Sequence, residues 1–461
     1  MMHPPTTPRP PRGEQPLSPS ELPARSGDRG QAVLLVEQLP MRPSPPPSRR
    51  TLPRSGGAAF LLCLGLLGPL GCGSDAPAPV PGPRWPIVLG GSSLDSLYGL
   101  EVDEAGSAYV LAKVSDPAGA RDRYVQLAAF SAEGEALWSR RLDEVANVWA
   151  LERDGRGQLY ITLTLGTSFA IDGRAGPGSG PHLLRFSEAS GALEGSLALG
   201  ETSLPYVATS RAGSIYLVGF TLNPTRIGAL TVQGAYVAGL DSSLQPRWAQ
   251  SLGICFGSMR RFAATDEAGH LYVSGVCRGP VDLGAGPFGG DTEVQQILVS
   301  WDLNGGLRWD RVLGQGEFHE DALRASDGLL YVSYELSSSV MIDGQLLAGG
   351  STQLLAFETS GGALSADRPL ASPALDHCLG AGSLLSLERG ELGTGTLTAS
   401  TLGALGAVSA PLLPEGAQVF ERIGCAPDGT VWVGGVAETD LDFGFGVVPN
   451  RGARDVFLMR L

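Results

Sequence analysis

A turn followed by an aromatic strand recurs along this chain, and no other feature restricts the fold as strongly. The first copy is 103–110 (DEAGSAYV), in which an Asp and a Gly precede an aromatic residue. The aromatic position returns at spacings of 51, 56, 56 and 59 residues, at Tyr160, Tyr216, Tyr272 and Tyr331. Trp432 follows 101 residues later, which leaves room for one degenerate copy around 382–386 (GSLLS). Periods of this length are typical of repeat folds, and we count seven copies.

Each copy continues in the same way. A Gly- and Asp-rich loop follows the aromatic strand, as at 281–284 (VDLG), and then an apolar strand such as 296–301 (QILVSW). A polar turn leads to a strand that contains Trp, as at 308–314 (RWDRVLG). With the strand before each turn, this makes four short strands per repeat of about 54 residues, the content of one blade of a β-propeller. We predict an all-β fold, a seven-bladed β-propeller over 84–461.

The two ends of the body predict how the ring closes. The chain ends at 455–461 (DVFLMRL), which aligns with the third strand of a repeat and leaves the last blade without a fourth strand. Residues 84–90 (RWPIVLG) match 308–314 (RWDRVLG) in five of seven places. We therefore expect the N-terminal strand to close the ring as the outer strand of the last blade.

The repeat resembles the seven-bladed β-propeller (SBBP) repeats of secreted bacterial proteins. Those repeats carry a Gly-Gly pair, an Asp-x-x-Gly-Asn-x-Tyr-Val turn and strand, and a closing Leu-Trp strand. The resemblance covers 85–461 and is strongest in the first and fourth repeats and weakest in the sixth. It implies a propeller in an exported protein and implies no activity, because fold alone does not determine function.

The first 83 residues predict export. Residues 1–55 are rich in Pro, Arg and Ser without apolar periodicity, so we expect a disordered segment that ends in a basic signal region. The apolar stretch 56–72 ends at Cys72 and is too short to span a bilayer. Residues 73–83 (GSDAPAPVPGP) read as a Pro-rich tether.

The residues before Cys72 resemble the lipobox of a bacterial lipoprotein signal. Gly71 fits the pattern, whereas Pro69 stands where Leu is usual and Leu70 fills the next place. The resemblance implies lipid attachment at Cys72, and Gly73 after it favours the outer membrane. An ordinary signal peptide with an incidental cysteine is the alternative. Residues 48–52 (SRRTL) resemble a twin-arginine export motif, with Sec export as the other route, and translation from Met41 instead of Met1 would give a signal peptide of normal length.

Composition excludes some functions. The chain has 47 Asp and Glu against 33 Lys and Arg, a net charge of −14, and such a surface repels nucleic acid. Its five histidines are scattered. His319 and His377 begin the inner strands of the fifth and sixth repeats and, with Asp321 and Asp376, form the one polar cluster that the pattern offers, which we interpret as lining of a solvated central channel. The run 302–306 (DLNGG) is interpreted as an ordinary turn and not as a calcium loop, so no metal site and no cofactor are predicted.

Four cysteines remain in the body of the protein. Cys255 precedes the inner strand of the fourth repeat and Cys277 ends its second strand, so a hairpin brings them to the same rim. Cys378 and Cys425 each lie four residues before a turn glycine in neighbouring repeats. In an oxidising compartment these positions suggest disulfides 255–277 and 378–425, the second requiring Cα atoms within about 7 Å. Free buried thiols are the alternative.

The function that follows is a non-enzymatic recognition or scaffold module. Irregular rim loops on a rigid scaffold suit the binding of a partner, here an envelope protein or a glycan. We expect a monomer held at the membrane by its lipid. The rival hypothesis is a hydrolase or lyase with its site at the channel mouth, and a purely structural envelope protein is the third.

Overall fold

The computed structural model describes residues 85–461, except for 92–93, 116–122, 254, 257–261, 280, 284–285, 289–293, 316–317, 337, 371, 373, 381, 390–394, 402–406, 411–417 and 444–446. These residues belong to one compact unit, Asp75–Leu461. The predicted segments 1–55, 56–72 and 73–83, with Cys72, lie outside the described residues. Among the residues described, no helix has the length and apolar character needed to cross a bilayer.

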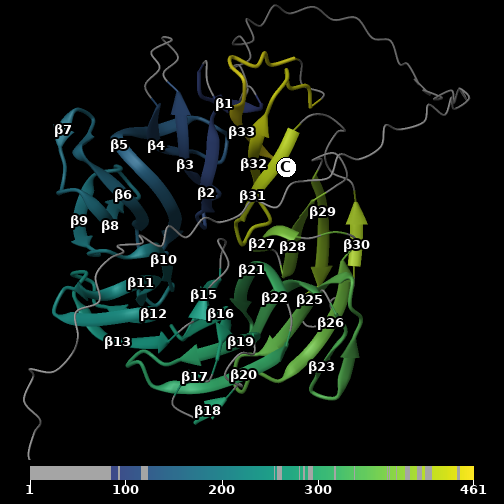
Figure 1. Cartoon of the computed structure of the whole chain (residues 1–461). Helices are drawn as coiled ribbons and strands as arrows, with labels where there is room; N and C mark the ends of the chain where they lie inside the picture. The colour runs from purple at the N-terminus through teal and green to yellow at the C-terminus, as the bar shows by residue number, and fades with distance from the viewer. Residues whose placement is uncertain are drawn as a thin grey trace, which may run out of the picture. The chain divides into compact units, whose positions relative to one another are not determined.

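The described residues form antiparallel sheets that follow one another along the chain (Figure 1). The first sheet comprises β2 (Ser96–Val102), β3 (Ala108–Ser115), β4 (Arg123–Phe130), β5 (Ala136–Arg153), β6 (Gln158–Ile171), β7 (Arg174–Ala175), β8 (Gly180–Ser187) and β9 (Leu193–Ala198). The next contains β10 (Ser203–Thr209), β11 (Ile215–Ile227), β12 (Leu230–Leu240) and β13 (Pro246–Gly253).

Three further sheets follow towards the C-terminus. One contains β14 (Cys255–Phe256), β15 (Ala263–Thr265), β16 (Leu271–Arg278), β19 (Val294–Trp301) and β20 (Leu307–Gln315), with the small pair β17 (Val281–Asp282) and β18 (Pro287–Phe288) beside it in sequence. Another has β21 (Phe318–Ser326), β22 (Leu329–Leu336), β25 (Ser351–Glu358) and β26 (Leu364–Leu370), with the pair β23 (Val340–Ile342) and β24 (Gln345–Leu347). The third has β27 (Ala374–Gly380), β28 (Ser383–Arg389), β29 (Gly395–Thr401) and β30 (Ala407–Ala410), where the sequence predicts the degenerate copy.

The last sheet combines the two ends of the described chain. It has the order β1 (Ile87–Leu89), β33 (Asp455–Arg460), β32 (Val431–Ala437) and β31 (Gln418–Cys425). β1 pairs antiparallel with β33, so that Val88 lies opposite Phe457. Strands from opposite ends of the described residues thus share one sheet, and β1 lies beside β33 in Figure 1.

The first strands of the repeats contact one another in chain order. β2 contacts the second half of β5, and the contacts continue through β10, β15, β21, β27 and β31. β31 in turn contacts β2. Repeated four-stranded antiparallel units packed side by side through their inner strands form a β-propeller. The predicted all-β class and propeller fold are therefore confirmed.

The repeated turn has a clear physical basis. Oδ1 of Asp103 accepts hydrogen bonds from the backbone N–H groups of Ala105 and Ser107, at 2.9 and 2.8 Å. Oδ2 of the same side chain accepts one from the Tyr109 hydroxyl at 3.1 Å. Gly106 has φ +80°, a conformation that favours glycine. The Asp and Tyr of the motif are therefore partners, because one carboxylate holds both the turn and the strand that follows it.

The structure differs from the sequence pattern at β5. The sequence predicts one strand around Trp138 and a separate one before Asp154, whereas β5 continues through both and joins two four-stranded units into one sheet. Glu144, at φ +56°, and register shifts on either side of Val145 turn the strand between the two units.

A loop that the sequence predicted to be irregular contains a small hairpin. Asp343 and Gly344 form the two-residue turn between β23 and β24, and an Asp-Gly pair favours such a turn.

Candidate functional site

A polar cavity lies where the inner strands end at their turns. Its volume is about 400 Å³. Residues at the ends of β2, β5, β10, β15, β21 and β27 line it, as does Pro427 after β31. The charged residues in its wall are Glu101, Arg153, Arg211, Asp266, Glu267, Arg324 and Asp327. Every unit of the propeller therefore contributes to one polar cavity.

Arg153 is held in this wall by carboxylates from two directions. Its guanidinium lies 2.5 Å from Glu104 and 2.9 Å from Glu188, and its side chain is 9% exposed. Burial raises the pKa of Glu188 to about 7, and the positive charge of Arg153 offsets this only in part. Glu104 also approaches Arg211, at 3.6 Å, so the network reaches the exposed rim of the cavity.

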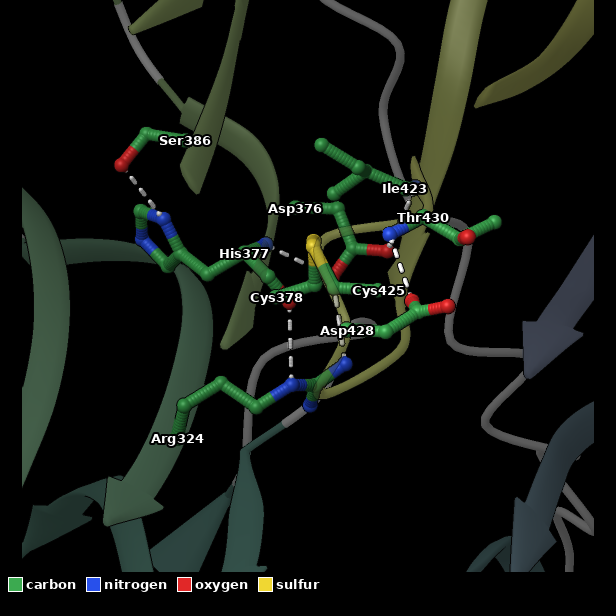
Figure 2. The surroundings of a disulfide bond; sticks show 9 residues. All are labelled: Arg324, Asp376, His377, Cys378, Ser386, Ile423, Cys425, Asp428 and Thr430. Atoms are coloured by element: carbon green, nitrogen blue, oxygen red, sulfur yellow. Dashed lines mark hydrogen bonds and ion pairs between the residues drawn. A yellow bond between two sulfur atoms is a disulfide. The ribbon is translucent and has the colours of Figure 1, made fainter. Parts of the chain in front are cut away.

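Arg324 is anchored to the neighbouring unit. Its Nε donates to the backbone oxygen of His377 at 3.0 Å, and its Nη2 lies 3.4 Å from Oδ1 of Asp376 (Figure 2). The other oxygen of Asp376 accepts from the backbone N–H of Ile423 at 3.3 Å. Arg324 and Asp376 thus connect β21, β27 and β31. The charges in the cavity wall are consequently positioned before any ligand arrives, which favours selective binding.

The expectation that His377 lines a solvated channel is wrong. His377 is fully buried, with Nδ1 2.9 Å from the Ser386 hydroxyl and Nε2 3.2 Å from that of Ser333. Burial lowers its pKa to about 4, although the negative charge of Asp376 opposes the shift. The side chain of His319 on β21 and that of Asp321 lie outside the described residues. His377 is therefore enclosed by its neighbours and does not line the cavity.

The burial of His377 makes a prediction about acid stability. Its folded pKa of about 4 lies below its ordinary value of 6.5, so the unfolded chain binds the proton first. Stability therefore falls as the pH drops from 6.5 to 4, by about 3 kcal/mol for this one group. We expect chemical denaturation to show this loss in the wild type and not in His377→Gln. His270→Gln, at a partly exposed turn, is the matched control. If the free energy of unfolding of His377→Gln fell with decreasing pH as steeply as that of the wild type, the loss would not come from His377.

The four cysteines of the body lie close together in two pairs, Cys255 with Cys277 and Cys378 with Cys425. Cys255 on β14 lies opposite Cys277 on β16, with Cα atoms 3.9 Å apart, and both are buried. Cys378 on β27 and Cys425 on β31 have Cα atoms 5.5 Å apart, inside the limit for a disulfide (Figure 2). The second disulfide connects two neighbouring units directly beside the cavity residues Leu379 and Pro427.

Asp302 of the turn 302–306 and the histidines His182 and His270 bond to nearby groups of the protein. Oδ1 of Asp302 accepts from the backbone N–H groups of Asn304 and Gly306, both at 2.8 Å, as expected of an ordinary turn. His182 is buried against the Gly180 oxygen, and His270 pairs with Asp266 at its own turn. Within the described ranges, no three metal-binding side chains come together.

Sequence reasoning did not identify the charged wall of the cavity. One signal was present, because Arg153, Thr209 and Thr265 each occupy the last place before the first residue of a turn. The Thr265 hydroxyl donates to the Thr209 oxygen at 2.6 Å, and the Thr209 hydroxyl donates to the Arg153 oxygen at 2.9 Å. A threonine directly before the turn therefore donates a hydrogen bond to the inner strand of the preceding unit.

Comparisons with known proteins find no close relative. No family model matches the chain, and no curated protein is similar to it. BamB from Moraxella catarrhalis is 11% identical, with a TM-score of 0.36 over 80% of this chain and 90% of its own. The quinohemoprotein alcohol dehydrogenase from Comamonas testosteroni is 10% identical, with a TM-score of 0.39 over 81% of this chain and 76% of its own. A chain of the mitotic checkpoint complex is 12% identical, with a TM-score of 0.41 over 81% and 95%. Similarities this low imply nothing about binding or catalysis.

Proposed function

We propose that the protein is a non-enzymatic recognition module, anchored at the bacterial envelope by a lipid on Cys72, with the central cavity as its binding site. The observation that carries this proposal is the cavity wall, where Arg153 is bound to Glu104 of the preceding unit and Arg324 to the His377 oxygen of the following unit. A preorganised, charged and concave surface suits selective binding of a partner. The partner is a protein of the same envelope.

The propeller in this proposal has seven blades and is closed by the N-terminal strand. Two observations support it. The contacts between inner strands return from β31 to β2, and β1 is the outer strand beside β33.

Export is supported by the cysteines as well as by the signal-like segment 56–72. The two pairs lie at disulfide positions, one within a unit and one between units. Disulfides persist in the oxidising compartments outside the cytoplasm. We propose that both pairs are oxidised in the exported protein.

The test is in-cell crosslinking of the tagged full-length chain, followed by identification of the proteins recovered with it. Arg211→Glu changes an exposed charge in the cavity wall, and Arg174→Glu makes the same change at an exposed residue of β7 outside this cavity. We expect one protein near stoichiometric amounts from the wild type and from Arg174→Glu, and at least tenfold less from Arg211→Glu. Cys72→Ser should release the protein from the membrane fraction.

Equal recovery from both charge variants would place the binding surface elsewhere on the propeller. Recovery of no specific protein from the wild type would contradict a protein partner, and binding to envelope glycans would then be measured with the same two variants. Retention of Cys72→Ser in the membrane fraction would contradict the lipid anchor.

A further inference from the structure

Two buried carboxylates lie where three segments of the chain meet: the residues after β1, the start of β2 and the start of β33. Asp95 has no exposed surface and Asp455 is 1% exposed. Asp and Glu are almost never this buried unless a cation or a full set of donors accompanies them. Among the described residues, no arginine or lysine forms an ion pair with either carboxylate.

Hydrogen-bond donors account for three of the four carboxylate oxygens. Asp95 accepts from the backbone N–H of Ser115 at 2.7 Å and from that of Gly91 at 3.2 Å, on separate oxygens. Oδ2 of Asp455 accepts from the backbone N–H of Arg451 at 2.6 Å. Oδ1 of Asp455 is buried and has no hydrogen-bond partner. An unsatisfied buried oxygen is costly, so its surroundings require an explanation.

The unsatisfied oxygen and the Asp95 carboxylate border the same small space beside Gly90. A Cβ placed on Gly90 would collide with the Asp95 carboxylate and lie 3.3 Å from Oδ1 of Asp455, so both side chains reach the same small space. Two ionised carboxylates in one buried site repel each other strongly. Burial raises the pKa of both groups, and ionisation of Asp455 would raise the pKa of Asp95 further, so the two carboxyl groups do not readily ionise together.

We propose that Asp455 is protonated in the folded protein at neutral pH and shares its proton with the Asp95 carboxylate. A proton on Oδ1 supplies the donor that this oxygen lacks and leaves one negative charge, which the N–H groups of Gly91 and Ser115 stabilise. A calcium ion is the less suitable occupant, because it takes six to eight oxygen ligands and no three metal-binding side chains converge within the described ranges.

The acid pair lies in the contact between the first and last sheets. The backbone N–H of Asp95 donates to the Arg454 oxygen at 2.8 Å, and Nε of Arg454 donates to the Asp95 oxygen at 3.1 Å. Arg451 and Arg454 are the charged groups beside the pair, and the charge of Arg451 favours ionised Asp455. Because the folded pKa is raised, the contribution of the pair to stability is complete at acid pH and is lost as the pH rises through that pKa. The stability of this junction therefore falls as the pH rises from about 4, the ordinary pKa of Asp, towards the raised folded pKa.

Infrared spectroscopy of the full-length chain tests the proposal directly. We expect the carbonyl band of a protonated carboxylic acid at pH 7 in the wild type and its loss in Asp455→Asn. The difference spectrum is necessary because burial also raises the pKa of Glu188 to about 7. Thermal unfolding between pH 5 and 9 supplies the second measurement. The amide introduced by Asp455→Asn keeps a donor towards Asp95, so we expect this variant to melt above the wild type by a margin that grows with pH.

Asp455→Ala is the matched control, because it removes the donor and should melt below the wild type at every pH. A wild-type spectrum without the acid band at pH 7 would overturn the proposal even if no variant folds. Calcium chloride that raises the melting temperature of the wild type and not of Asp455→Asn would also overturn it, since a metal ion would then occupy the site.

Discussion

A chain that lacks residues 1–89 should unfold far more readily than one that lacks residues 1–83. The two differ only in the segment 84–89, which contains β1. In the structure Ile87, Val88 and Leu89 pair with β33 and are partly buried against the core of the last sheet. Trp85 packs edge-on against Trp432 with ring centroids 5.1 Å apart. Loss of these apolar contacts should lower the free energy of unfolding by about 5 kcal/mol.

Chemical denaturation of the two truncated proteins measures the difference. Both lack the signal and the tether, so a difference between them reports on the strand alone. Equal midpoints would mean that β1 contributes nothing and that the last sheet is stable with three strands. If the shorter protein elutes as an oligomer, this would be independent support for ring closure by β1. The β33 edge that β1 normally covers would then be exposed and would pair between molecules.

Replacement of Trp432 by Ala should cost about 4 kcal/mol. This side chain is fully buried, and truncation of a buried aromatic ring costs about 3–5 kcal/mol. Its Nε1 donates to the Gly106 oxygen at 2.9 Å, a bond between the last sheet and the first turn of the body. Trp432→Phe keeps most of the apolar contact and loses this bond, so we expect a loss nearer to about 1 kcal/mol. The free energy of unfolding of both variants is the measurement.

A double-mutant cycle that combines Trp85→Ala with Trp432→Ala separates two contributions to stability. One is the packing of Trp432 in the core, and the other is its contact with Trp85 of the N-terminal segment. If the two rings stabilise each other, the double variant should lose less than the sum of the single losses, by about 1 kcal/mol. Additive losses would contradict the contact between the N-terminal segment and the last sheet. Leu222→Ala, at a side chain that is 72% exposed, is the neutral control.

The other tryptophans explain why the closing strand of the repeat carries this residue. Nε1 of Trp138, Trp248 and Trp309 donates to the backbone oxygens of Glu188, Leu303 and Thr359, at 2.7, 3.0 and 2.9 Å. Each oxygen belongs to a turn in the following unit. A Cβ at Gly362 would lie 2.8 Å from the Trp309 ring, so a glycine at this turn is needed to leave room for the ring. Each of these three outer strands is thus bonded to the following unit at the same place in the repeat.

Local patterns were sufficient to predict the repeated elements. The Asp-x-x-Gly turn and its Tyr are close in sequence, and Asp103 bonds to Ala105, Ser107 and Tyr109, all within six residues. The interpretation of 302–306 as a turn agrees with the structure for the same reason, since Asp302 bonds to nearby backbone. The continuous β5 was missed, because whether two strands merge depends on the geometry between two sheets and not on the residues of either.

The sequence by itself determined the all-β class, the number and order of the repeats that we propose as blades, and the similarity of the first strand to the outer strands. These properties follow from short-range hydrogen bonds and alternating burial, which are written in adjacent residues. Only the tertiary structure decided that His377 is sealed between Ser333 and Ser386, that Arg153 and Arg324 lie in one cavity wall, and that Asp95 and Asp455 are buried beside the same glycine. Those relations join side chains of different sheets, and Asp95 and Asp455 come from opposite ends of the body. The surroundings and protonation of these particular side chains, on which function depends, are set by packing between sheets and not by a local pattern.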